Sequence, residues 1–407
     1  MPGQPEHVLV VGAGLGGLRT AEQLRSAGYQ GRISLVGAEP HPPYDRPPLS
    51  KQVLTGAWEP ERAVLRDEDA LDELGVRAFL GTRAVSLRPG QVELADGATL
   101  HGDAVVIATG LAARRLPGQP SNVHVLRTLE DSVALRATLE RARSLLVVGA
   151  GFIGAEVASA ARARGLDVTV LEALEVPSAR ALGERVGVLC GRLFTESGVD
   201  LRTGTGPARF LDPGSSVAVE LADGTRLEAD AGIVGVGAVP TLEWLDCSGL
   251  DAALVDPAAG IRCEGPGRVL GAPDLWAVGD VAAWADPVLG VRRFEHWTNA
   301  GDQAVAVARD ILGGPQRTEP VPYFWSDQFG LKIQLVGRPE LADGLVELHG
   351  DGLGGGAVRG TVVGYVTGDR LVAVVGFGAA RLVARYRALV AAGAGRDDAL
   401  ETARSLA

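Results

Sequence analysis

Cysteine is scarce in this sequence. The chain of 407 residues contains three cysteines, Cys190, Cys247 and Cys263, and they are too far apart to form a C-x-x-C or C-x-x-x-x-C pair. A disulfide framework or a cysteine-ligated metal site needs cysteines at short, regular spacings. We therefore expect no disulfide framework and no metal site.

Lysine is also scarce, so nearly all of the positive charge is arginine, and the 50 acidic residues outnumber the 39 basic ones. Lys51 and Lys332 are the only lysines, and the formal net charge is −11 at pH 7. Binding to a phosphate backbone needs a basic face, so nucleic acid is not expected as the main partner. The apolar run His7–Val11 is too short for a signal sequence or a membrane span. These features predict a cytoplasmic protein that does not act on membranes.

A glycine motif lies close to the N-terminus. The β-type run Val8–Val11 ends in G-x-G-x-x-G at Gly12, Gly14 and Gly17, and a helical pattern from Leu18 to Ala27 follows. The first glycine permits a tight turn, the second lets the backbone approach a pyrophosphate, and the third lets helix and strand pack closely. The segment therefore predicts a dinucleotide-binding turn.

An acidic residue follows this motif. A second expected strand, Ile33–Val36, leads to Glu39. The spacing from the glycines is near that at which a carboxylate accepts hydrogen bonds from ribose hydroxyls.

The same unit recurs in the middle of the chain. The run Leu145–Val148 is followed by Gly149, Gly151 and Gly154, then by an alanine-rich helical pattern, and the next strand ends at Glu172. A carboxylate at that place accepts a bond from a 2′-hydroxyl and repels a 2′-phosphate. The second motif therefore favours NADH over NADPH, with a solvated surface charge as the alternative interpretation of Glu172.

A further repeat supports a duplication. Glu93–Leu100 and Glu220–Leu227 both read as hairpins turned at Asp-Gly, and each leads to a buried strand that ends at glycine, Ala104–Gly110 and Ala231–Gly237. The order of motif, hairpin and strand occurs twice. We expect two doubly wound domains of common plan.

A third glycine segment connects these features to a known family. Leu275–Ala277 is a short expected strand that leads to Gly279 and Asp280. With these motifs in this order, the whole chain resembles the flavoprotein disulfide reductase superfamily, which has two dinucleotide-binding domains. The resemblance implies that the first motif holds FAD, that the second holds NAD(P)H, and that Asp280 binds the flavin ribityl and phosphate. The alternative for Asp280 is the N-cap of a helix beginning at Val281.

The resemblance implies an α/β fold with two Rossmann-like domains and a C-terminal α+β domain. We expect the FAD-binding domain at 1–111 and 238–319, the NAD-binding domain at 112–237, and the C-terminal interface domain at 320–407. Within the last, Lys332–Val336, Thr361–Val366 and Leu371–Val375 are expected antiparallel strands, and a helix is expected from Ala380.

The redox cysteines of disulfide reductases are missing from the place they occupy in that superfamily. The segment there, His41–Lys51, contains Y-D-R-P-P-L-S-K instead, and no cysteine precedes Cys190. A thiol relay cannot be built without thiols. The segment resembles the signature of the ferredoxin reductases of oxygenase systems, the putidaredoxin-reductase-like and rubredoxin-reductase-like enzymes. Its prolines predict a loop with no helix before Leu49.

The resemblance assigns roles to single residues. Lys51 is expected near flavin N5, Arg46 on a polar part of the cofactor, Arg127 on FAD, Glu156 near the nicotinamide carboxamide, and Trp297 beside the flavin ring. The alternative for Lys51 and Arg46 is a solvated loop, and the alternative for Arg127 is a hinge salt bridge. For Glu156 it is an exposed carboxylate in the first helical turn, and for Trp297 it is a core position.

We therefore expect Lys51, Glu156 and Trp297 to be catalytic. The positions expected to bind FAD or NADH are Gly12, Gly14, Leu15, Gly16, Gly17, Glu39, Arg46, Lys51, Ala84, Ala108, Thr109, Gly110, Arg127, Gly149, Gly151, Phe152, Ile153, Gly154, Glu156, Glu172, Gly237, Gly279, Asp280, Glu295, His296 and Trp297.

The implied function is that of an NADH:ferredoxin oxidoreductase. Hydride passes from NADH to FAD, and single electrons then pass to a 2Fe–2S ferredoxin that supplies an oxygenase. The ferredoxin is expected to bind transiently, and the reductase to be a monomer or weak dimer. A rubredoxin reductase or a nitrite-reductase component is an open alternative. A signalling flavoprotein like apoptosis-inducing factor is disfavoured by the acidic charge and by the lack of a targeting segment.

Overall fold

The computed structural model describes residues 4–211, 214, 216–245, 250, 254–286, 288–315 and 321–406. Cys247 and the expected domain boundary between residues 319 and 320 lie outside these ranges. The chain forms two compact units. The first comprises residues 1–45, 61–112 and 238–320, and the second comprises residues 46–60, 113–237 and 321–407.

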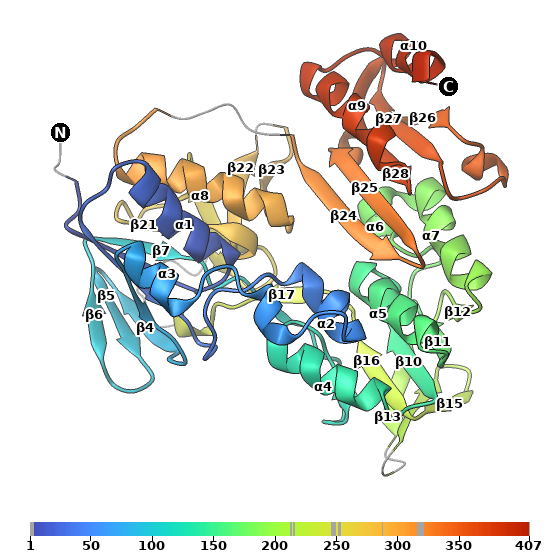
Figure 1. Ribbon diagram of the computed structural model, residues 1–407, viewed down its shortest axis with the longest axis horizontal. Helices are drawn as coiled ribbons and strands as arrows, with labels where there is room; N and C mark the ends of the chain where they lie inside the picture. Colours follow the sequence, from blue (N-terminus) through green and yellow to red (C-terminus); the bar gives the residue numbers. More distant parts are fainter. Residues whose placement is uncertain are drawn as a thin grey trace. The chain divides into compact units, whose positions relative to one another are not determined.

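The first unit is built on one large sheet (Figure 1). Its strands follow the order β23 (Gly290–Arg292), β22 (Ala282–Asp286), β19 (Gly260–Glu264), β20 (Arg268–Val269), β21 (Leu275–Ala277), β7 (Ala104–Ile107), β1 (His7–Val11), β2 (Arg32–Val36) and β3 (Val76–Phe79), with β18 (Val255–Asp256) paired to β19. From β21 to β3 all neighbours are parallel, and the apolar strands β1 and β7 lie at the centre. Such fully apolar runs are typical of parallel strands that are buried on both faces.

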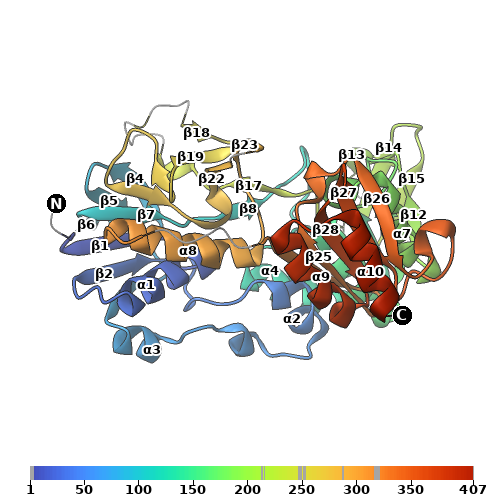
Figure 2. The same ribbon diagram turned by 90° about the horizontal axis from the view of Figure 1, so that it is seen from above.

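The side chains of β1 point alternately to the two faces of this sheet. Val8 and Val10 pack against α1 (Leu15–Ser26) and α8 (Trp297–Ile311), which lie side by side along one face (Figures 1 and 2). Leu9 and Val11 point the other way, because successive strand side chains alternate. That face is covered by a small antiparallel sheet of β4 (Ala84–Arg88), β5 (Gln91–Leu94) and β6 (Thr99–His101).

The second unit contains a parallel sheet of the same plan. Its strands follow the order β12 (Asp200–Arg202), β11 (Asp167–Leu171), β10 (Ser144–Val148), β16 (Ala231–Val234) and β9 (Val123–His124). The helices of this part of the second unit are α2 (Gln52–Thr55), α4 (Leu129–Leu139), α5 (Phe152–Ala163), α6 (Ala179–Leu182) and α7 (Glu184–Glu196). An antiparallel hairpin sheet of β13 (Pro207–Leu211), β14 (Val217–Leu221) and β15 (Arg226–Ala229) completes the repeat, as β4–β6 do in the first unit.

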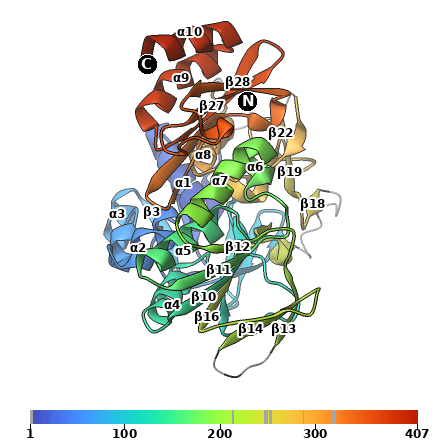
Figure 3. The same cartoon turned by 90° about the vertical axis from the view of Figure 1, so that its right-hand side faces the viewer.

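A C-terminal antiparallel sheet also belongs to the second unit. Its strands follow the order β24 (Tyr323–Gln328), β25 (Leu331–Gly337), β28 (Arg370–Phe377), β27 (Val362–Thr367) and β26 (Gly344–His349). One face packs on α6 and α7, and the other is covered by α9 (Ala380–Ala392) and α10 (Arg396–Leu406), as Figure 3 shows. This sheet is therefore the middle layer of a three-layer arrangement.

The predicted fold class and duplication are confirmed, and two local expectations are wrong. No helix begins at Val281: a short 3-10 turn, Gly279–Val281, leads directly into β22. A 3-10 helix begins at Pro47 rather than after Leu49 and ends at Ser50. Proline lacks a backbone N–H and has a fixed φ, and both properties suit the first turn of a helix. None of the described helices combines the length and the hydrophobicity that a membrane span requires.

Candidate functional site

The first glycine loop has two closed positions and one open position. A Cβ at Gly12 or Gly17 would collide with the carbonyl oxygen of Ala108 or Gly12, respectively, whereas a Cβ at Gly14 would have no heavy atom within 4 Å. Gly12 also has a φ of +119°, which disfavours any other residue. Helix α1 begins at Leu15 without a side-chain cap. The loop therefore presents open backbone and a helix N-terminus, a combination that suits an anionic ligand.

The second glycine loop repeats this pattern. A Cβ at Gly149 would approach the carbonyl oxygen of Gly235 to 2.5 Å, and one at Gly154 would collide with that of Gly149. A Cβ at Gly151 would again have no heavy atom within 4 Å. Helix α5 begins at the next residue, also without a side-chain cap. The two loops are thus equivalent in the space that they leave for a ligand.

Both predicted acidic residues accept hydrogen bonds within their own units. The Glu172 carboxylate accepts hydrogen bonds from the backbone N–H groups of Ala150, at 2.7 Å, and Leu174, at 2.9 Å. Ala150 is a residue of the second glycine loop, so Glu172 lies against that loop. Glu39 accepts a hydrogen bond from the Tyr44 hydroxyl.

Other predicted positions of the first unit form the turns beside the first loop. The Thr109 hydroxyl donates to the Thr241 carbonyl at 2.9 Å, and Gly110 has a φ of +65°. The Gly279 N–H donates to the buried Gln303 side chain at 2.7 Å, and Asp280 is half-buried next to it. Ala84 differs from these residues, because its side chain lies in the hydrophobic core.

Trp297 lies at the surface of the first unit rather than in its core. It is the first residue of α8, and 36% of it is exposed. Its indole Nε1 donates to Asp45 Oδ1 at 2.6 Å, a contact that the sequence did not predict. Of the other predicted residues here, His296 occupies the N-cap position of α8 without a side-chain capping bond, and Glu295 pairs with Arg293 at 3.0 Å.

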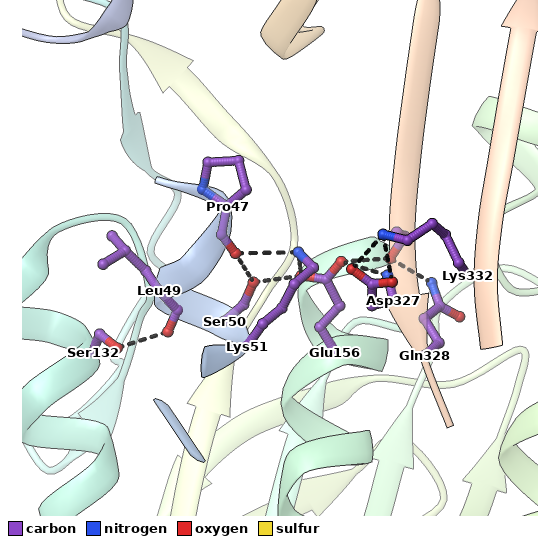
Figure 4. Close-up of polar contacts among 10 residues, drawn as sticks. Pro47, Leu49, Ser50, Lys51, Ser132, Glu156, Asp327, Gln328 and Lys332 are labelled. Carbon is purple, nitrogen blue, oxygen red and sulfur yellow. Dashed lines mark hydrogen bonds and ion pairs between the residues drawn. The ribbon is translucent and has the colours of Figure 1, made fainter. Parts of the chain in front are cut away.

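A buried ion pair is the centre of the second unit's polar site. Lys51 Nζ lies 2.7 Å from Glu156 Oε2, and the two side chains are 13% and 3% exposed (Figure 4). The alternative of an exposed first-turn carboxylate is therefore wrong. The hydroxyls of Ser50 and Ser326 also donate to Glu156, the latter at 2.5 Å, as does the Asp327 N–H at 3.3 Å. A buried carboxylate is stable only with such partners.

The proline segment holds Lys51 in place. Lys51 Nζ also donates to the Pro47 carbonyl at 3.2 Å, and the Ser132 hydroxyl donates to the Leu49 carbonyl at 2.6 Å. Arg46 donates to the Arg127 carbonyl at 2.5 Å, just before the capping box that begins α4. The predicted FAD contacts Arg46, Lys51 and Arg127 thus belong to the second unit, with Glu156.

The remaining predicted residues lie at the ends of helices or strands. Leu15 and Gly16 begin α1, Phe152 and Ile153 begin α5, and Gly237 has a φ of +99° beyond β16. The sequence missed Ser50, Ser132 and Ser326 as members of the site. Ser50 stands inside the recognised signature, and Ser326 stands inside the aromatic segment Val321–Gly330, which resembles the family's C-terminal domain, so both could have been found there. Ser132 carries no such signal.

Comparisons with known proteins agree with this geometry. Residues 6–304 match the family model of the pyridine nucleotide-disulphide oxidoreductases, and residues 323–405 match that of the reductase C-terminal domain. The chain is 38% identical over 404 residues to the ferredoxin–NAD(+) reductase subunit of the benzene 1,2-dioxygenase system of Pseudomonas putida. This similarity covers 97% of the chain and 91% of the relative.

Solved structures give the same assignment. The reductase in the covalent putidaredoxin reductase–putidaredoxin complex is similar with a TM-score of 0.88 and 34% identity, covering 95% of this chain and 93% of that one. The ferredoxin reductase of the CYP199A2 system from Rhodopseudomonas palustris is similar with a TM-score of 0.89 and 30% identity, covering 99% and 100%. The resemblance inferred from the motifs is confirmed. The chain belongs to the pyridine nucleotide-disulphide oxidoreductase family and, within it, to the ferredoxin–NAD(+) reductases with a reductase C-terminal domain.

Proposed function

We propose that this chain is an FAD-dependent reductase that takes hydride from NADH and delivers single electrons to a 2Fe–2S ferredoxin of an oxygenase system. The relatives named for benzene dioxygenase and for the CYP199A2 system support an oxygenase as the final acceptor. The covalent complex of a relative with putidaredoxin supports a small redox protein as the direct partner.

The observation that carries the proposal is the pair of equivalent glycine loops. Both have two positions closed to a side chain and one open position at the start of an uncapped helix. A pyrophosphate fits such a site, because the backbone can approach it and the helix N-terminus favours its charge. We assign FAD to the loop at Gly12–Gly17 and NADH to the loop at Gly149–Gly154. The proposal includes an FAD-binding domain at 1–111 and 238–319, an NAD-binding domain at 112–237 and a C-terminal interface domain at 320–407.

The choice of NADH rests on Glu172. Its carboxylate lies against the second glycine loop and accepts the Ala150 N–H. A 2′-phosphate brought to this loop would meet a negative charge, whereas a 2′-hydroxyl would donate a hydrogen bond to it. By its spacing from the first glycine motif, we assign Glu39 to the ribose of FAD.

Bound FAD supplies the conversion of a two-electron hydride into two single-electron transfers. The chain's own residues supply binding and charge. We propose that the Lys51 ammonium, held by Glu156, would stabilise negative charge on the reduced cofactor, and that Glu156 would orient the nicotinamide carboxamide. Trp297 would shield the flavin ring, held by its bond to Asp45. The remaining predicted positions, from Ala108 to Gly110 and at Gly279 and Asp280, would bind FAD.

An anaerobic titration tests the proposal. The purified yellow protein is titrated with NADH and with NADPH while flavin absorbance is followed, and turnover is then measured with a 2Fe–2S ferredoxin and with a rubredoxin. We expect NADH to bleach the flavin far faster than NADPH and the ferredoxin to be reduced. Faster reduction by NADPH would refute the role of Glu172. Reduction of the flavin without electron transfer to the ferredoxin would refute the proposed acceptor.

A further inference from the structure

The two carboxylate oxygens of Glu156 are supplied by different parts of the second unit. Oε2 accepts the Ser50 hydroxyl and the Lys51 ammonium, both from the segment that follows Pro47. Oε1 accepts the Ser326 hydroxyl at 2.5 Å and the Asp327 N–H at 3.3 Å, both from β24. The carboxylate plane is thus fixed from two sides, and the C-terminal sheet supplies one of them.

The direction of the Ser326 hydrogen bond follows from its neighbour. The side-chain nitrogen of Gln328 lies 3.1 Å from Ser326 Oγ. An amide nitrogen only donates, so Ser326 Oγ accepts there and its own proton is left for Glu156. Ser326 and Gln328 are 0% and 1% exposed, so water does not compete for these bonds. Figure 4 shows Glu156 between Ser50 and Lys51 on one side and Asp327 and Gln328 on the other.

Strand β24 is held in register with helix α5 on both sides of this contact. The rings of Phe324 and Phe152 lie 4.3 Å apart, and the Phe329 N–H donates to the Ser159 hydroxyl at 2.8 Å. Phe152, Glu156 and Ser159 are spaced i, i+4, i+7 and share one helix face. Phe324, Ser326 and Gln328 are spaced by two and share one strand face. The matching periods place Ser326 opposite Glu156.

We propose that Ser326 is a positioning residue, oriented by Gln328, which holds the Glu156 carboxylate toward Lys51. The C-terminal segment is then a component of the reductive site and not only a face for a partner. The proposal rests on the proposed function, in which the pair of Lys51 and Glu156 acts on the bound cofactors.

Lysine content makes a direct test possible. Because Lys51 and Lys332 are the only lysines, the full-length protein labelled with 13Cε/15Nζ-lysine gives two side-chain signals. The Lys51 signal reports on its contact with Glu156, and the signal of the exposed Lys332, which is paired with Asp327 at 2.8 Å, reports on the strand next to Ser326. The variants are Ser326→Ala, Ser326→Thr and Gln328→Met. The matched control is Ser159→Ala, which removes a hydroxyl from the same helix–strand interface without touching Glu156.

At pH 7 we expect Ser326→Ala to move the Lys51 signal, Ser326→Thr to return it toward the parent position, and Ser159→Ala to leave it unmoved. Loss of one hydrogen bond to a charged group should also slow flavin reduction by NADH about tenfold. The KM for NADH should stay within about twofold, since the second glycine loop and Glu172, to which most of the NADH binding is assigned, are unchanged. Gln328→Met should shift the Lys51 signal in the same direction by less, and it replaces Ser326→Ala should that variant not fold.

The proposal is overturned by a Lys51 signal that stays at the parent position in Ser326→Ala and Gln328→Met. It is also overturned by an equal movement in Ser159→Ala, because that would indicate general loosening of the interface. The signal is measured without NADH or ferredoxin, so this outcome is separate from a failure of the proposed function. If the proposed function fails, the parent protein itself shows no flavin reduction by NADH, whatever the position of the Lys51 signal.

Discussion

At the scale of single residues, Lys51 and Glu156 depend on each other. Both side chains are largely buried, 2.7 Å apart. Removal of one member of a buried pair leaves the other charge without compensation. We expect Glu156→Gln to lower the free energy of unfolding by about 3 kcal/mol and to slow flavin reduction. Urea denaturation and stopped-flow absorbance measure the two effects.

The double variant Lys51→Met/Glu156→Gln is the control for this prediction. It removes both charges, so it should recover part of the lost stability without recovering the rate. A double-mutant cycle gives the interaction between the two sites. Losses of stability that simply add would contradict the pairing, because they would mean that neither charge depends on the other.

Both described cysteines are buried, and burial disfavours their charged form. Burial raises the pKa of the Cys190 thiol, and likewise that of Cys263, to about 12. The thiolate is the reactive form, and at pH 8 its population in the folded protein is negligible. We expect iodoacetamide at pH 8 to leave both residues unmodified until denaturant is added, as determined by peptide mass spectrometry. Alkylation of either residue in the native protein at the rate of a free thiol would refute this.

At the scale of structural elements, each glycine loop contains one position at which glycine is needed for packing and another at which it leaves room for a ligand. Gly17 and Gly154 have no room for a Cβ, whereas Gly14 and Gly151 do. We expect Gly17→Ala and Gly154→Ala to lower the free energy of unfolding by about 2–3 kcal/mol, since overpacking forces the backbone apart. Thermal and urea denaturation measure the change.

The open glycines are the matched controls within the same motifs. Both have extended N-cap backbone with negative φ, which alanine adopts without strain. We expect Gly14→Ala and Gly151→Ala to change stability by less than about 1 kcal/mol while weakening retention of FAD and binding of NADH, respectively. An alanine at the open positions that destabilises as much as one at the closed positions would contradict the distinction.

The sequence predicted the elements whose patterns are local. The apolar strands before the glycine loops and the Asp-Gly hairpins follow from runs and turns of a few residues. Helix α10 and strand β24 were missed. Helix α10 is strongly charged and buries only the small side chains of Ala399 and Ala403, so few large apolar residues mark its buried face. Strand β24 mixes aromatic and polar residues, because Ser326 on one of its faces contacts Glu156.

The site itself was only partly predictable. Glu156 and Lys51 were found through motifs, but their contact joins residues 105 apart in sequence. The Ser326 contact with Glu156 joins residues 170 apart. Neither distance leaves a local pattern, since serine at these positions is ordinary in strands and turns. Pairing of such residues is decided by the docking of elements, which composition and periodicity do not specify.

At the scale of the whole molecule, the C-terminal sheet is part of the second unit's core. Buried side chains of α7, such as Val186 and Leu193, form one hydrophobic cluster with Ile333, Val375 and Phe377 of the sheet. For this reason residues 321–407 belong to the same compact unit as residues 113–237. The second unit is therefore expected to unfold without its C-terminal segment, since the face of α7 would be exposed to water.

Two truncations test this expectation. A chain ending at Pro315 loses the entire C-terminal sheet, and we expect it to aggregate or to lose the cooperative urea transition of the second unit. A chain ending at Gly395 loses only α10, whose buried residues are two alanines, so it should stay folded with a modest loss of stability. Circular dichroism and urea denaturation distinguish the two. A chain ending at Pro315 that unfolds at the urea midpoint of the full protein would show that the sheet is an appendage, because its contacts with α7 would then contribute nothing to the stability of the second unit.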